Sequence, residues 1–120
     1  MAHREPPQIR WTAVLWGGAV ALVTAVVLLY ALGPGLGTVA AFLAVAAGGL
    51  VAGRLAPGAG SLHGGLVAVF WIVAEALSDP FFATAPNVLG DAASTVVADV
   101  LRLAIGVGSG WAGARLGGRR

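Results

Sequence analysis

Three ionisable residues lie inside long apolar stretches of this sequence: Glu75, Asp99 and Arg102. A charged side chain near the middle of a membrane-spanning helix costs about 2.5–3.5 kcal/mol, so such residues face the interior of a helix bundle and pair with one another. Asp99 and Arg102 are three positions apart, which places them on one face of a helix. We therefore expect an intramembrane polar cluster in which Glu75, from another helix, and Asp99 flank Arg102.

Two roles fit this cluster. A buried ionic group can fix the register of helices against one another, which is a structural role. Alternatively, Glu75 binds a proton or a cation, because acidic residues within membrane spans mark transport pathways. The sequence leaves both roles open.

His63 is a further residue whose side chain could bind a metal or carry a proton. No second histidine or acidic residue stands near it at a ligand spacing, so we expect no metal site. We expect a hydrogen bond from His63 to the preceding turn or to a lipid phosphate. Because the chain has no cysteine and no other catalytic pattern, we expect neither an enzyme nor a cofactor.

The composition defines the surroundings of these residues. Hydrophobic residues make up 58% of the 120 residues and charged residues 10%, with a mean hydropathy of +0.90. These values lie outside the range of soluble globular domains and indicate a membrane protein of one domain. A nucleic-acid partner is not expected, because the chain has no lysine and its arginines form no basic stripe with interleaved aromatic residues.

Four apolar stretches predict four transmembrane helices, at about 11–32, 36–55, 62–77 and 95–116. The first is long enough to cross a hydrocarbon core of about 30 Å at about 1.5 Å per residue. Short turns rich in proline and glycine follow the first and second stretches, so we expect an all-α polytopic fold of two tandem helical hairpins. Residues 1–10 and 117–120 are expected to be cytoplasmic tails.

The longest connection between the spans is 78–94, on the outer side. Ser78 or Asp79 as N-cap, followed by a proline, predicts a separate short helix there. Its Phe81 and Phe82 are expected to anchor it in the membrane interface, and the alternative is a lid over the bundle.

Arginine placement predicts the orientation, because arginine and lysine are retained on the cytoplasmic side. The opposite loops carry only Asp79 and Asp91, whereas one side of the four-span arrangement holds Arg4, Arg10, Arg54, Arg115, Arg119 and Arg120. We therefore expect a multi-pass protein of the prokaryotic inner (cell) membrane with both termini in the cytoplasm. Arg54, His63 and Arg115 are expected at the inner interface, where the arginines attract anionic lipid.

Small residues recur at the spacing of close helix packing: Gly49, Gly53, Gly64, Gly106, Gly110 and Gly113. Within lipid the hydrophobic effect does not draw helices together, so backbone contact through small residues supplies much of the association. Such contacts form within the chain or between subunits, which leaves open a homodimer or a partner membrane protein.

Each of the last two spans carries a stripe of polar and small residues along one face. We expect these stripes to face each other, one holding Gly64, Ala68, Trp71 and Glu75 and the other Asp99, Arg102, Gly106, Ser109 and Gly113. An internal repeat is also predicted, because Gly17-Gly18 and Arg54-Leu55 recur as Gly64-Gly65 and Arg115-Leu116. It indicates two hairpins of the same orientation related by a pseudo-two-fold axis along the membrane normal.

The central stretch resembles a pattern of small prokaryotic four-span membrane proteins of unknown function, written GGxxAGRxA followed by GxxHGxxxG. The matching residues are Gly48, Gly49, Ala52, Gly53, Arg54 and Ala56, then Gly60, His63 and Gly64. This resemblance implies a fold and a membrane location but no activity. Small multidrug-resistance transporters are similar in size and span number, but their glutamate is in the first span. Fluoride channels have a break in the third span that is missing here.

These observations lead to two hypotheses about function. We expect a structural or interaction subunit that packs through its glycine-rich helix faces. The alternative is a small dimeric proton- or ion-coupled transporter or channel that uses Glu75 and Arg102.

The orientation can be tested with a reporter enzyme fused after Arg120. A reporter enzyme that works only in the cytoplasm should be active in this fusion, because the arginines hold that end of the chain inside. The same reporter inserted at Gly35 serves as the control and should report the opposite side. A periplasmic signal from the Arg120 fusion would contradict the predicted orientation.

Overall fold

The computed structural model describes residues 6, 8–82 and 88–118, without the side chains of 34 and 79–92. The described chain is helical apart from short connections, with helices α1 (Trp11–Leu32), α2 (Gly37–Leu55), α3 (Gly60–Phe82) and α4 (Val88–Gly117). By length and composition, four segments can cross a membrane: Trp11–Leu32, Gly37–Leu55, Pro57–Ser78 and Ala93–Gly117. The predicted all-α, multi-pass architecture is confirmed.

The turns between the first three helices are short. After α1, Gly33 adopts a φ of 82°, and its N–H donates to the carbonyl of Leu29 at 2.9 Å. Only glycine reaches this left-handed region at little cost, so Gly33 ends α1. Single 3₁₀ turns at Pro34–Leu36 and Pro57–Ala59 then lead directly into α2 and α3.

The prediction for the outer connection is wrong. Residues 78–82 continue α3 and residues 88–94 belong to α4, so no separate short helix begins at Ser78. The Ser78 hydroxyl donates to the carbonyl of Ala74 at 2.7 Å, a bond within a helix, where an N-cap would accept from the following N–H groups. The interfacial anchoring expected of Phe81 and Phe82 lies outside the described side chains.

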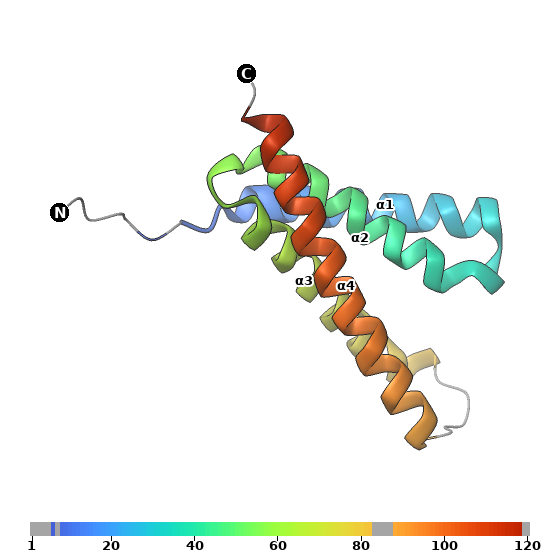
Figure 1. The fold of residues 1–120 in the computed structure, drawn as a ribbon. Coiled ribbons are helices and arrows are strands. Elements are labelled where there is room, and N and C mark those ends of the chain that lie inside the picture. The colour runs from blue at the N-terminus through green and yellow to red at the C-terminus, as the bar shows by residue number, and fades with distance from the viewer. Residues whose placement is uncertain (1–5, 7, 83–87, 119–120) are drawn as a thin grey trace.

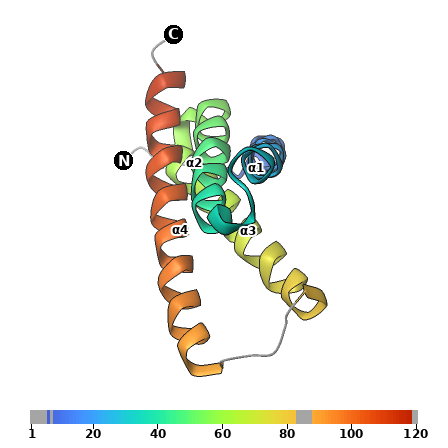
Figure 2. The same ribbon diagram turned by 90° about the vertical axis from the view of Figure 1, so that its right-hand side faces the viewer.

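The helices form two arms that meet at one end (Figure 1). The α1–α2 pair and the α3–α4 pair lie together where α1 starts, where α2 leads into α3 and where α4 ends. We call this the closed end. Toward the opposite, open end the two arms separate (Figure 1), and the rotated view shows that α3 and α4 also diverge from each other there (Figure 2). Helix α2 packs against all three other helices, whereas α1 and α4 do not pack on each other.

Glycine contacts join the helices in the closed half. Gly53 of α2 lies against Gly110 of α4, and a methyl group at Gly53 would overlap the Gly110 carbonyl oxygen. Gly64 of α3 is packed in the same way against Gly106 of α4, and Gly17 of α1 against Gly48 of α2. The helices therefore meet backbone to backbone, without side chains between them.

All six glycines that the sequence marked for helix packing take part in such contacts. Gly49 packs on Ser109, Gly110 on Gly60 and Gly113 on Leu50, in addition to the pairs named above. Within the described chain these glycines are therefore used between its own helices.

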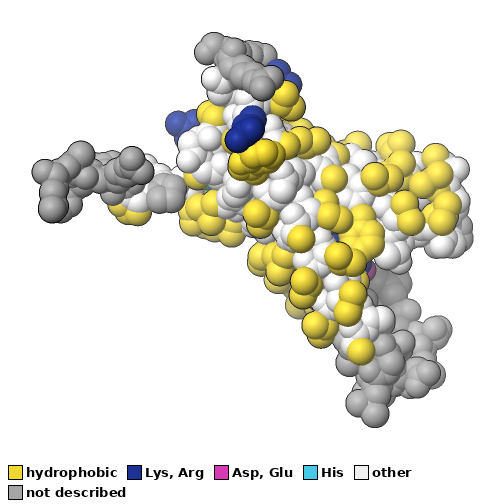
Figure 3. Space-filling view, in the orientation of Figure 1, with side chains coloured by type: hydrophobic (Ala, Val, Ile, Leu, Met, Phe, Trp, Pro, Cys, Tyr) yellow, Lys and Arg dark blue, Asp and Glu magenta, His cyan; other side chains and the backbone are white. Residues whose placement is uncertain are grey.

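The interior consists mainly of small side chains, whereas the larger ones point outward. The hydrophobic core cluster contains Val14, Ala21, Ala25, Ala44, Ala52 and Val67. Leucine, valine, tryptophan and tyrosine side chains are exposed along both arms, with Tyr30 91% exposed (Figure 3). This inverse arrangement suits a chain surrounded by lipid, where an exposed apolar surface costs nothing.

Two glycines of α4 provide a matched test of the backbone packing. Gly110→Ala places a methyl group against Gly60 and Gly64, and we expect it to destabilise the fold by about 1–3 kcal/mol. Gly108 has nothing within 4 Å of a built Cβ, so Gly108→Ala should leave stability unchanged or raise it by up to about 1 kcal/mol. Unfolding of both variants in detergent, followed by circular dichroism, measures the difference. Equal unfolding midpoints for the two variants would show that the backbone contact at Gly110 does not stabilise the fold.

Candidate functional site

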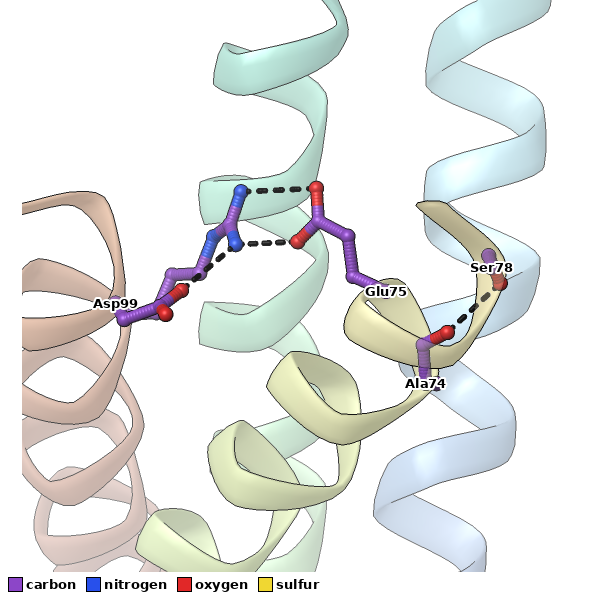
Figure 4. Close-up of polar contacts among 5 residues, drawn as sticks. Ala74, Glu75, Ser78 and Asp99 are labelled. Atoms are coloured by element: carbon purple, nitrogen blue, oxygen red, sulfur yellow. Dashed lines mark hydrogen bonds and ion pairs between the residues drawn. The ribbon is translucent and has the colours of Figure 1, made fainter. Parts of the chain in front are cut away.

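Arg102 lies between two carboxylates where the arms begin to separate. Its Nη1 donates to Glu75 Oε2, and its Nη2 lies 3.3 Å from Glu75 Oε1, which makes a two-point contact between α4 and α3. The same Nη1 lies 3.2 Å from Asp99 Oδ1, one turn away on α4 (Figure 4). The predicted contact of Arg102 with both acids is therefore present. We call these three residues the triad.

The three members of the triad are not equally buried. Arg102 is 7% exposed, and its guanidinium lies 5.8 Å from the centre of the Phe42 ring of α2. The side chains of Glu75 and Asp99 are 42% and 28% exposed. The cation thus lies inside the bundle, and the two anions are more exposed than the cation.

A cavity of about 270 Å³ extends from the triad toward the open end. Its walls come from three helices, with Thr38 from α2, Glu75 and Ala76 from α3, and Ala98 and Asp99 from α4. Because α4 begins at Val88 and not near 95, Arg102 lies close to the middle of this helix. The part of α4 that can cross a membrane begins at Ala93, close to the predicted boundary at about 95.

One member of the predicted α3 stripe faces another direction. Gly64 and Ala68 pack on Gly106 of α4, and Glu75 reaches Arg102, as expected. Trp71 instead packs against the core cluster formed by α1, α2 and α3, where its indole Nε1 is buried without a hydrogen-bond partner. The stripe is split because α3 contacts three other helices, and a single helical face cannot meet all of them.

On α4, the part of the stripe nearer the C-terminus packs on α2, and not on α3 as expected. Ser109 and Gly113 pack on Gly49 and Leu50 of α2, whereas Gly106 contacts α3. Helix α4 therefore lies in the groove between α2 and α3, and the stripe serves both.

His63 is fully buried at the closed end. Its Nε2 accepts the backbone N–H of Arg10 at 2.9 Å, and its Nδ1 lies 2.7 Å from the carbonyl oxygen of Ala59. A backbone N–H can only donate and a carbonyl can only accept, so this geometry assigns the hydrogen to Nδ1. The imidazole thus joins the start of α1 to the turn between α2 and α3.

The sequence predicted one of these two hydrogen bonds. The bond to the preceding turn is present, but the full burial of His63 leaves no surface for a lipid phosphate. The contact with Arg10 was missed. Its signal is that the residue preceding a predicted helix carries an N–H outside the helical hydrogen-bond pattern.

The other two residues expected at the inner interface lie on the surface of the closed end. Arg54 is exposed in the last turn of α2, and Arg115 is in the last turn of α4 with its guanidinium 4.1 Å from the centre of the Trp111 ring. Basic side chains gather around this end in Figure 3. Both positions also suit a helix C-terminus, which carries partial negative charge.

Among the described residues, no group of three or more histidine, cysteine, aspartate or glutamate side chains could hold a metal ion.

No protein-family model matches the chain, and no curated protein and no solved structure matches it. The resemblance to small prokaryotic four-span proteins stays a prediction.

A double-mutant cycle tests the coupling within the triad. Arg102→Leu should destabilise the fold by about 3–5 kcal/mol, because it leaves two carboxylates without a cation. We expect Arg102→Leu combined with Glu75→Leu to be less damaging than the sum of the single changes by at least about 1 kcal/mol. Unfolding in detergent gives the three values.

Ser78→Ala serves as the control partner in this cycle. Ser78 lies on α3, one turn beyond Glu75, but its hydroxyl bonds only the backbone of Ala74 among the interactions described. Its combination with Arg102→Leu should be additive within about 0.5 kcal/mol. Additivity for both pairs would show that Arg102 and Glu75 are not energetic partners.

Proposed function

We propose that this chain is a structural or interaction subunit of a prokaryotic inner membrane, with both termini in the cytoplasm and without catalytic activity. The observation that carries the proposal is the division of the bundle into two halves. In the closed half the helices touch through their glycines, and in the open half they separate. Gly53–Gly110 and Gly64–Gly106 join the helices at backbone distance near the closed end. At the other end the arms part around a polar site.

This division favours an interaction subunit over a channel formed by one chain. Backbone contact between α2, α3 and α4 leaves no room among them for a water-filled path from the triad to the closed end. The open half, by contrast, exposes both polar and apolar side chains that another membrane protein could cover. The six glycines predicted for helix packing contact other helices of this chain, so the proposed interaction surface is the open half.

The arginines at the closed end support the proposed orientation. Arg10, Arg54 and Arg115 begin or end helices there, and their side chains are exposed. In the proposed orientation they lie at the cytoplasmic surface, where anionic lipid headgroups attract basic side chains by about 1 kcal/mol each.

Transport is a second candidate function, and one observation favours it. Glu75 is 42% exposed and lines an open cavity, which an acid that binds a proton or a cation requires. A transporter would have to open the closed half, by movement of the two hairpins or in a dimer.

The two candidate functions predict different results in purification and in reconstituted liposomes. As an interaction subunit, the 11.9 kDa chain should copurify from its native membrane with a second membrane protein and produce no proton or sodium flux in liposomes. A flux that Glu75→Gln abolishes and Ser78→Ala leaves intact would contradict the proposal and establish transport. Migration of the native chain alone in mild detergent would also contradict it.

A further inference from the structure

His63 holds the chain at the start of α1. The backbone N–H of Arg10 donates to Nε2 of His63 at 2.9 Å, a contact between residues 53 positions apart. Arg10 is the N-cap of α1, and its carbonyl oxygen accepts the N–H groups of Ala13 and Val14. The Arg10 side chain makes no cap hydrogen bond, so the bond to the imidazole fixes how the chain enters α1.

The bond between His63 and Arg10 depends on the protonation state of the ring. Nδ1 carries a hydrogen and donates to the carbonyl oxygen of Ala59, which leaves Nε2 with the lone pair that accepts from Arg10. A proton that binds to Nε2 turns this acceptor into a donor. Two N–H groups then face each other, so the bond to Arg10 is lost while the bond to Ala59 stays.

The charges around His63 act in the same direction. Among the described residues, the ionisable side chains at the closed end besides His63 are cations: Arg10 before α1, Arg54 in the last turn of α2 and Arg115 in the last turn of α4. On α3 itself the nearest described acid is Glu75, about 18 Å away along the helix. A protonated His63 therefore has no carboxylate partner among these groups, and a buried charge without a partner is costly.

The part of the chain that covers His63 is not part of the packed core. Residues 8–10, which we call the strap, are exposed, and Gln8 and Arg10 line a cavity of about 310 Å³ together with His63 and the turn at Pro57–Ala59. A proton can reach the ring through this cavity. The helices of the closed half are joined by their glycine contacts, so the strap is the element that can move when the ring is protonated.

We propose that His63 is a pH-sensitive latch for the strap. Only the neutral ring can accept the Arg10 N–H, so the strap is held at neutral pH and released as the pH falls. Release also frees the first turn of α1. In the proposed orientation the latch responds to the pH of the cytoplasm. Every group that it uses belongs to this chain, so the latch does not depend on the proposed interaction function.

Nuclear magnetic resonance of the isotope-labelled full chain in lipid nanodiscs tests the latch. The ring nitrogens of His63 should show a hydrogen on Nδ1 alone at about pH 7.5 and on both nitrogens at about pH 5. Over this range the hydrogen-exchange protection of the Arg10 amide, corrected for the intrinsic rate at each pH, should fall by about tenfold. The Ala56 amide, which donates to Ala52 at the same end, should keep its protection.

Variants separate the latch from its pH dependence. In His63→Gln the side-chain oxygen can accept the Arg10 N–H at either pH, so the amide should stay protected in acid. His63→Leu offers no acceptor, and Arg10 should lose its protection at both pH values. His3→Gln and Glu5→Gln are the controls, because they remove other groups that titrate in acid, and both should respond as the native chain does. Circular dichroism confirms that each variant is folded.

Three results would overturn this inference. They are a hydrogen on Nε2 of His63 at neutral pH, protection of the Arg10 amide that is the same at both pH values, and an equal loss of protection in the His63→Gln variant. If that variant does not fold, the two measurements on the native chain still decide. Copurification with a partner, or its absence, tests the proposed function and leaves these measurements unchanged.

Discussion

The fold depends on backbone contact between helices through glycine. A membrane chain gains little from burying apolar side chains, because lipid is equally apolar, so its helices associate where their backbones can touch. In this chain those places are Gly17 with Gly48, Gly53 with Gly110 and Gly64 with Gly106, and all lie in the closed half. Larger side chains point to the outside, and the arms separate beyond the last glycine contact. The arms therefore separate where the glycine contacts between helices end.

The triad lies at this transition. Gly106 is one turn from Arg102 on α4, so the long guanidinium side chain begins just where the backbones no longer touch. Closer packing would exclude Arg102, and wider separation would leave it without Glu75. The two-point contact to Glu75 joins α3 to α4 at the base of the cavity, and the exposed carboxylates face the space between the arms. One arrangement thus gives both a structural lock and a surface that another charged group can reach.

The sequence was sufficient for features that depend on short-range periodicity. The spans, the packing glycines and the pairing of Arg102 with two acids follow from hydropathy and from spacings of three and four residues. Features that depend on how the helices cross were not predicted. Trp71 was assigned to the face of Glu75 but packs in the core, and the separation of the arms has no pattern in any single helix. The separate helix expected at Ser78 is absent because α3 continues through this residue to Phe82, where the Ser78 hydroxyl bonds the Ala74 carbonyl of the same helix. The burial of His63 requires the start of α1 and the turn before α3 to meet, which no local pattern encodes.

The most direct test of this account is thiol accessibility along α4, since the chain contains no cysteine of its own. Ala98→Cys lines the cavity, whereas Ser109→Cys lies against Gly49 in the sealed half. A membrane-impermeant thiol reagent, added in native membranes on the side opposite the termini, should label Cys at the first position and not at the second. Labelling at both positions, or at neither, would contradict a bundle that is open at one end and sealed by glycine at the other.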